Sequence, residues 1–408
     1  MRLFLMTATA MTSLFLSLHG QAEQDTDWAT SARMLAQKAL IVDTHIDVPY
    51  RLQDGWVDVT VATKGGDFDY KRARQGGLNV AFMSIYTPAE LEAEGGSFRL
   101  ANELIDSVEA IAGRAPKKFA MVDTAGEAVK AKTVGLIGLA LGMENGAPIE
   151  GKLENLAFFY QRGIRYITLT HSLSNHISDS SYDENRPWQG LSPFGKDVVA
   201  EMNRLGIMVE ISQVSDQAFF QVIEISTAPV IASHSSARHF TPGFERNMSD
   251  EMIQALADNG GVIQINFGSS FLTPEVQAWM KAKGESEKAW LKETGFVEDS
   301  PEAKAWELGY REQFPFPYAA VSDVADHIDH VVGLTGIQSV GIGSDFDGVG
   351  DSLPEGLKDV SFLPALIEEL LRRDYSKEQI EAILGGNLIR VWRKVEYVAK
   401  AAQAENPA

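Results

Sequence analysis

The chain has 408 residues, of which 45% are hydrophobic and 23% are charged, a balance that argues against wholesale disorder and allows one large domain or two smaller ones. It carries 36 Lys and Arg against 56 Asp and Glu, and this anionic excess argues against nucleic acid as a partner. Because the chain contains no cysteine, disulfides, thiolate metal sites and a cysteine nucleophile are excluded.

The first predicted element is an export signal. Arg2 precedes an apolar stretch over residues 3–18, and a small-residue cleavage motif ends at Ala22. This pattern is typical of a secretory signal peptide; a membrane anchor is the alternative, although a spanning helix needs ~20 apolar residues. We therefore expect a signal peptide over residues 1–22, a single domain over 23–408, and an exported, periplasmic or secreted protein without a stable membrane anchor.

Beyond the N-terminal region, short β-branched runs alternate with longer helical patterns. The runs are nearly continuously apolar, as is typical of parallel strands buried on both faces. Eight runs are predicted to be strands, the number that a (β/α)8 TIM barrel requires: residues 39–47, 79–86, 134–145, 164–171, 206–215, 229–236, 261–268 and 339–348. A doubly wound open sheet is the competing fold, but no Gly-x-Gly-x-x-Gly motif follows the first run to support it.

Three long segments interrupt this alternation. Residues 48–78 and 87–133 follow the first two predicted strands, and residues 270–320 separate the last two. The third segment is rich in charged and aromatic residues with a helical pattern. We expect it to form a helical insertion beside the mouth of the active site.

Polar side chains gather at the C-terminal ends of the predicted strands, where barrel enzymes place their active sites. The first strand ends in the sequence DTHID, and alternate residues of a strand point to one face. The polar residues at the strand ends are Asp43, His45, Asp47, Glu144, His171, Gln213, His234 and Asp345. Any one of these histidines could be an ordinary core residue. As a set, they favour a hard or borderline divalent cation, zinc above all, and a carboxylate can bridge two such ions.

The motifs that carry these residues resemble those of the membrane dipeptidase (renal dipeptidase) family, within the amidohydrolase superfamily. The resemblance runs from about Leu40 to Trp392 and rests on DTHID, GGLNVAFMSIY, LGMENG, YITLTHS, GLSPFGKDVVAEMNRLGIMVEIS, PVIASHSSAR, RNMSD, GIGSDFDGV and GNLIRVW. It implies a TIM barrel of the metal-dependent hydrolase type with helical insertions. It also implies hydrolysis of dipeptides with a free C-terminal carboxylate, D-residues included, by a zinc-activated bridging hydroxide. A homodimer is compatible with it.

The resemblance further implies which residues hold the metal. His45 and Asp47 would bind the first zinc ion, Glu144 would bridge to a second, and His234 would bind that second ion. The family has a histidine where this chain has Gln213, and an amide oxygen is a weaker zinc ligand than an imidazole. One ion, two ions or an altered metal preference therefore all stay open.

The remaining roles concern the substrate. By resemblance, His171 would stabilise the oxyanion, Arg246 would bind the C-terminal carboxylate, and Asp345 would act as general base and then acid. Gly268 departs from the larger residue that the family often has near the substrate, which leaves the substrate preference open.

Other polar residues receive structural roles. Asp43 is expected to support the metal ligands and Asp347 its local loop, while four histidines are expected at the surface or at helix caps: His176, His239, His327 and His330. Two other functions stay open. One is a catalytically impaired, peptide-binding relative, owing to Gln213. The other is an amidohydrolase that acts on lactones or cyclic amides.

Overall fold

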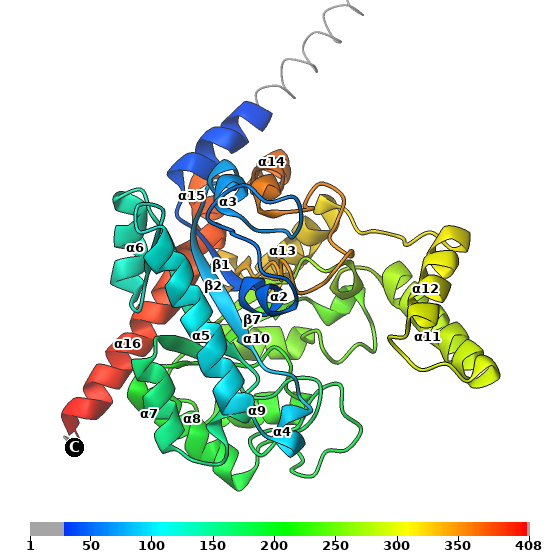
Figure 1. Cartoon of the computed structure of the whole chain (residues 1–408). Coiled ribbons are helices and arrows are strands. Elements are labelled where there is room, and N and C mark those ends of the chain that lie inside the picture. Colours follow the sequence, from blue (N-terminus) through cyan, green and yellow to red (C-terminus); the bar gives the residue numbers. More distant parts are fainter. Residues whose placement is uncertain (1–27, 406–408) are drawn as a thin grey trace, which may run out of the picture.

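The protein is a barrel of parallel strands surrounded by helices (Figure 1). The structure, a computed structural model, describes residues 28–405; the predicted signal peptide, residues 1–22, lies outside them. The strands are β1 Ile41–Ile46, β2 Leu78–Tyr86, β3 Phe119–Met121, β4 Ile137–Glu144, β5 Ile164–Thr168, β6 Met208–Glu210, β7 Ile231–Ser235, β8 Val262–Ile265 and β9 Val340–Ile342.

The order of the strands confirms the TIM barrel and rules out the doubly wound sheet. The sheet runs β1-β2-β4-β5-β6-β7-β8-β9, and every neighbouring pair is parallel. A parallel bridge between Ile46 and Phe346 joins the two ends of this order. All eight predicted strands are present. The three-residue strand β3, which pairs with β4 outside this path, was not predicted.

Helices fill the connections between the strands. Residues 28–38 are helical, and the helices that follow are α2 Val48–Asp54, α3 Tyr70–Gly76, α4 Leu91–Glu94, α5 Ser97–Arg114, α6 Ala125–Thr133, α7 Glu154–Gln161, α8 Pro193–Leu205, α9 Asp216–Ile225, α10 Asp250–Asp258, α11 Pro274–Thr294, α12 Pro301–Gln313, α13 Val321–Thr335, α14 Leu363–Arg372, α15 Lys377–Glu381 and α16 Asn387–Glu405. Short 3-10 turns are η1 Ala147–Ile149, η2 Arg238–Phe240, η3 Ser269–Phe271, η4 Ile337–Ser339 and η5 Val360–Phe362, and η6 Ala382–Gly386 is a π-helical turn.

Local sequence fixes where several of these helices begin. Ser192, Thr273 and Ser300 each precede a proline, and each side chain accepts a hydrogen bond from a backbone N–H in the first turn of α8, α11 or α12. A hydroxyl at the N-cap satisfies a free N–H, and proline at the first helical position has no N–H to leave unpaired. The Ser-Pro and Thr-Pro pairs thus mark these starts in the sequence.

The apolar core lies partly inside the barrel. Strand residues such as Phe82 and Tyr166 form one buried cluster with Trp392 of α16, and the ring centroids of Phe82 and Trp392 are 5.1 Å apart. Strands that are apolar on both faces therefore fill the barrel on one side and contact the helices on the other. The polar residues that form the candidate site lie outside this core, at the C-terminal ends of the strands.

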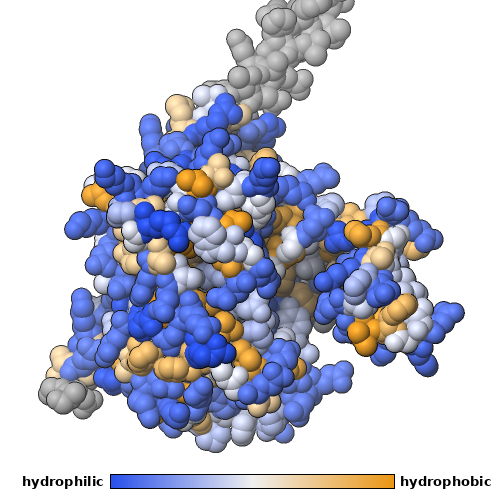
Figure 2. All heavy atoms as spheres, viewed as in Figure 1, coloured by the Kyte–Doolittle hydropathy of each residue, from blue (hydrophilic) through white to orange (hydrophobic). Residues whose placement is uncertain are grey.

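Helices α11 and α12 form an arm that projects from the barrel, and Figure 2 shows a recess between this arm and the main body. The arm confirms the helical insertion predicted over residues 270–320. Its Trp290 and Trp306 stack at 5.8 Å, and Arg311 pairs with Asp351 of the loop after β9 at 3.1 Å. Within residues 28–405, no helix has the length and apolar character needed to cross a bilayer.

Candidate metal centre and active-site pocket

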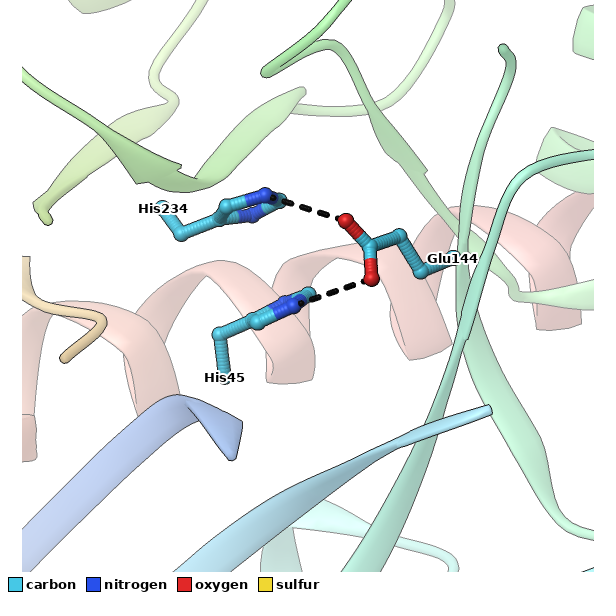
Figure 3. Close-up of side chains that lie close together, drawn as sticks. All are labelled: His45, Glu144 and His234. Atoms are coloured by element: carbon cyan, nitrogen blue, oxygen red, sulfur yellow. Dashed lines mark ion pairs between the residues drawn. The ribbon is translucent and has the colours of Figure 1, made fainter. Parts of the chain in front are cut away.

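The carboxylate of Glu144 lies beside two stacked, buried imidazoles and faces both of them, as Figure 3 shows. Nε2 of His45 is 3.3 Å from Oε2 of Glu144, and Nε2 of His234 is 3.4 Å from Oε1. The two rings stack with centroids 3.7 Å apart. The three residues lie on β1, β4 and β7, so the parallel barrel brings them together from distant parts of the sequence. Each imidazole faces a different oxygen of one carboxylate, an arrangement suited to a carboxylate that bridges two cations.

Two more carboxylates converge beside His45. Nε2 of His45 is 3.5 Å from Oδ2 of Asp47, and ligand atoms of His45, Asp47 and Asp345 all lie within 4.8 Å of one another. A Cβ atom at Gly348 would lie 2.2 Å from Oδ1 of Asp345 and 2.3 Å from Oδ2 of Asp47. Glycine at this position therefore leaves the room in which the carboxylates of Asp47 and Asp345 approach each other.

Hydrogen bonds orient both imidazoles. The hydroxyl of Tyr166 donates its only proton to the carbonyl of Thr44 at 2.9 Å, so it must accept the bond from Nδ1 of His45 at 3.0 Å. Nδ1 of His234 likewise lies 2.8 Å from the hydroxyl of Ser233. A ring nitrogen held in this way directs the other nitrogen and its lone pair toward a metal. In both residues that other nitrogen is Nε2, which faces Glu144.

The charges of the cluster fit a cation. Burial favours a neutral His45, but the charges of Glu144 and Asp47 outweigh it and raise the pKa of His45 to about 10. Burial raises the pKa of Asp47 well above its usual range, whereas His45 and the other imidazoles outweigh burial at Glu144 and hold its pKa well below. Nε2 of His45 is buried without a hydrogen-bond partner. A divalent ion can take the place of the proton that these carboxylates attract.

Gln213 sits where a further metal ligand is expected. Its side chain is buried just beyond β6, and its amide nitrogen donates to Oε1 of Glu144 at 2.6 Å and lies 3.3 Å from Nε2 of His234. The Gln213 side chain therefore contacts both Glu144 and His234. Its N–H occupies the same Glu144 oxygen that faces His234, and this bond competes with a cation at that oxygen.

A cavity of about 810 Å³ opens over the cluster. Its wall includes the predicted residues Asp47, Glu144, His171, Gln213, His234, Arg246 and Asp345. Nε2 of His171 lies 3.5 Å from Oε1 of Glu144, and the His171 side chain is 22% exposed. Asp345 accepts a hydrogen bond from the amide of Asn266 at 2.7 Å. The arm contributes Trp279, Lys283 and Arg311 to the outer wall, as the sequence predicted for an insertion beside the mouth.

Arg246 is a buried cation at the wall of this cavity. Its guanidinium donates to the hydroxyl of Ser235 and to the carbonyl of His234, each at 2.8 Å, and lies over the ring of Phe271 at 5.2 Å. Among residues 28–405, no carboxylate lies within ion-pair distance of it. A buried guanidinium that lacks an internal counter-charge is suited to an anionic ligand.

Asp43 does not join the metal cluster. Its Oδ1 accepts hydrogen bonds from the backbone N–H groups of His45 and Ser344 at 3.1 and 3.0 Å. It thereby joins β1 to the segment after β9, as expected of a supporting residue. Burial raises its pKa to about 6. Asp347 supports its loop by accepting from Asp67 N–H at 2.6 Å.

The prediction for His327 is wrong. This residue was expected at the surface or at a helix cap, but it is fully buried on α13. Its Nδ1 accepts from Ala237 N–H at 2.9 Å, and its Nε2 lies 3.0 Å from the carbonyl of Leu272. Since a backbone N–H only donates and a carbonyl only accepts, the ring is a neutral Nε2–H tautomer. Of the other three, His239 is exposed, and His176 and His330 are half-buried.

Sequence reasoning missed several residues that complete the site: Tyr166, Ser233, Asn266 and Gly348. They carry no metal-ligand pattern of their own. Three of them are polar or small residues within or just beyond predicted strands, and Tyr166 is the one hydroxyl-bearing aromatic of its strand. Those positions, next to the predicted ligands, are the sequence feature that could have pointed to them.

Comparisons with known proteins agree with this geometry. Residues 29–406 match the model of the membrane dipeptidase family, peptidase family M19. The chain is 33% identical to an uncharacterized dipeptidase of Schizosaccharomyces pombe, over 90% of this chain and 82% of that protein. It is 32% identical to mouse Dipeptidase 3, over 90% of this chain and 66% of that protein. The structure of the probable dipeptidase PvdM from Pseudomonas aeruginosa superposes with a TM-score of 0.80 at 26% identity, over 92% of this chain and all of that one (100%).

Proposed function

The chain belongs to the membrane dipeptidase family of metallopeptidases, and from this premise we propose that it is a zinc-dependent dipeptidase specific for dipeptides with a free C-terminal carboxylate. The observation that carries the proposal is the arrangement of His45, Glu144 and His234, in which two oriented imidazoles face the two oxygens of one buried carboxylate. D-residues at the C-terminal position are included in the proposed substrate class.

We assign His45, Asp47 and Glu144 to a first zinc ion. The second position has Glu144, His234 and, weakly, Gln213, so the chain would hold one or two ions. A bound divalent ion lowers the pKa of a coordinated water and polarises an amide carbonyl. Nitrogen and oxygen donors are the ligands that zinc accepts in catalytic sites. The donor set therefore suits zinc at both positions, with the second weakened by the amide.

Three further residues act on the peptide. Arg246 would bind the C-terminal carboxylate, since it is buried, lines the cavity and has no internal counter-charge. His171, with Nε2 beside Glu144 at the cavity wall, would donate to the oxyanion that develops on the scissile carbonyl. Asp345 would take a proton from the attacking water and return it to the leaving amine. The Asn266 amide holds Oδ2 of Asp345 and leaves Oδ1 beside Gly348 and Asp47.

The proposal extends to the whole chain. A signal peptide over residues 1–22 would direct the protein to the periplasm or the exterior, and residues 23–408 would form a single catalytic domain. Cleavage after Ala22 can be read from the N-terminal sequence of the protein purified from the cell envelope or the medium.

The proposed function is tested by a matched pair of substrates. A dipeptide and its C-terminally amidated form differ in one charge. The wild-type protein should hydrolyse the free acid at least tenfold faster, because the amidated form loses one charge-assisted hydrogen bond worth ~1.5–3 kcal/mol. Hydrolysis of both at equal rates would remove the carboxylate from substrate recognition. Turnover of lactones or cyclic amides in preference to either peptide would favour the other amidohydrolase activity.

One observation favours a second candidate, a relative that binds peptides without cleaving them. The Gln213 N–H donates to the Glu144 oxygen that a second ion would need. If that bond prevents formation of the catalytic centre, the zinc-loaded protein will bind the dipeptide in a calorimetric titration but release no free amino acids. Release of amino acids from the same samples would exclude this candidate.

A further inference from the structure

A second group of metal-ligand side chains lies on the outside of the barrel, away from the cavity. We infer that His239, Asp250 and His330 form a separate binding site for a divalent transition ion such as Zn²⁺. Their ligand atoms all lie within 4.8 Å of one another. None of the three lines the active-site cavity, so this inference does not rest on the proposed dipeptidase function.

The three side chains come from three different elements. His239 lies in η2, Asp250 is the first residue of α10, and His330 lies in the second half of α13. The rings of His239 and His330 stack at 4.3 Å with an angle of 22° between their planes. Nε2 of His330 lies 2.7 Å from Oδ1 of Asp250. Two stacked imidazoles beside one carboxylate thus occur twice in the described chain, here and at Glu144.

The distances allow one ion to contact all three residues. Zinc lies ~2.0–2.2 Å from nitrogen and oxygen ligands, so the ligand atoms of one tetrahedral ion are roughly 3.4 Å apart. The His330–Asp250 contact needs to widen by less than an ångström, when an ion replaces the shared proton. His239 is exposed, and neither of its ring nitrogens is hydrogen-bonded to any of residues 28–405. This free imidazole can therefore turn toward the ion without breaking another bond.

The neighbouring groups limit the site to these three ligands. The other two carboxylates on this part of α13, Asp326 and Asp329, are both bonded to Arg373 at 2.6 Å. His327 uses both of its nitrogens on backbone groups. A site with two imidazoles, one carboxylate and an open position takes zinc or a similar borderline ion in preference to Ca²⁺ or Mg²⁺, which need more oxygen ligands.

An ion at this site would join η2 to α10 and α13. The η2 turn lies in the connection from β7 to α10, which also carries Arg246. In binding experiments Ca²⁺ and Mg²⁺ serve as negative controls, because this site offers fewer oxygen ligands than either ion needs.

The test is zinc stoichiometry in tag-free, full-length protein. After chelator treatment and equilibrium dialysis against Zn²⁺, elemental analysis should show one equivalent less in His239→Ala and in His330→Gln than in the wild type. His176→Ala is the matched control, because Nδ1 of His176 pairs with Glu92 at 2.8 Å but has no second imidazole at that pair. It should bind as much zinc as the wild type.

The outcome is independent of the active site. In a His234→Ala background, His239→Ala should still remove its equivalent, and crystals soaked in Zn²⁺ should show an anomalous peak between His239, Asp250 and His330. Equal zinc content in wild type and His239→Ala, or an anomalous map with no peak at these residues, overturns the inference. An active site without metal would contradict the proposed function and leave this equivalent in place.

Discussion

Tyr166 and His45 are joined by a hydrogen bond of 3.0 Å between the phenolic oxygen and Nδ1. The tyrosine gives its proton to the Thr44 carbonyl, so the bond requires a proton on Nδ1 of His45. The relationship fixes the tautomer of the imidazole and leaves Nε2 free to face Glu144. Tyr166, inside the barrel, thus determines which ring nitrogen of His45, at the rim of the barrel, is available to a cation.

Tyr166→Phe should weaken zinc binding at the first position. The change removes one oxygen and leaves the ring packing intact, and loss of a bond that orients a metal ligand typically costs roughly 10- to 100-fold in affinity. Competition with a chromogenic chelator measures the affinity. Tyr375→Phe is the control, since its hydroxyl bonds to Asp329, outside the cavity wall. Unchanged zinc affinity in Tyr166→Phe would show that this bond does not orient His45.

Gln213→His should tighten the weaker of two zinc-binding steps. The wild type offers an amide next to Glu144 and His234, and an imidazole is the better zinc ligand. Calorimetric titration of the metal-free protein should show one tight and one looser step, of which only the looser one tightens in the variant.

Gln213→Leu provides the matched comparison, because it removes the amide without adding a ligand. Two equally tight ions in the wild type, with the same affinities in Gln213→His, would contradict the role given to Gln213.

Arg246→Ala should reduce kcat/KM for free dipeptides by about tenfold or more, on the scale of one charge-assisted hydrogen bond at ~1.5–3 kcal/mol. The same substitution should have little effect on the amidated dipeptide, because that substrate has no carboxylate to lose. Both values come from steady-state rates with the two substrates. A proportional loss on both substrates would assign Arg246 to the structure of the loop and not to the carboxylate.

His327 should make the stability of the fold depend on pH. Burial lowers its pKa from 6.5 to about 4, so the unfolded chain binds a proton in this range that the folded chain excludes. Its contribution to stability is therefore present above pH 6.5 and is lost as the pH falls toward 4. Between pH 7 and 5 the loss amounts to about 2 kcal/mol.

His327→Gln keeps groups that can bond to Ala237 and Leu272 but cannot titrate. Urea unfolding at pH 7 and pH 5 should show that the wild type loses about 2 kcal/mol more than the variant over this interval. Identical losses in the two proteins would mean that His327 is protonated without cost in the folded state.

The barrel could be predicted because short local stretches of the sequence mark each of its strands. Each strand is an apolar run, and the run is followed by polar residues that a parallel barrel collects at one rim. For this reason His45, Glu144 and His234, far apart in the sequence, could be expected to meet. The strand β3 could not be expected, because its three residues are too few to give a periodic pattern inside a long excursion.

What the sequence did not reveal are the contacts between elements. In the sequence, Tyr166 is one residue of an apolar strand, and only the closed barrel brings its hydroxyl to Nδ1 of His45. A position for His327 at the surface or at a helix cap is wrong, and the residue lies three positions after Val324 and four before Val331, both buried on α13. That helical spacing indicates the inner face of the helix, so its burial could have been predicted. Its bonds to two other segments could not.

We propose that this chain hydrolyses dipeptides with a metal held by His45, Asp47, Glu144 and His234. The most direct measurement follows the release of free amino acids from a dipeptide by one preparation in three states: as purified, after exhaustive chelation with metal loss verified by elemental analysis, and after addition of Zn²⁺. Turnover should disappear with the metal and return with zinc. Undiminished turnover by protein verified to be metal-free would contradict it.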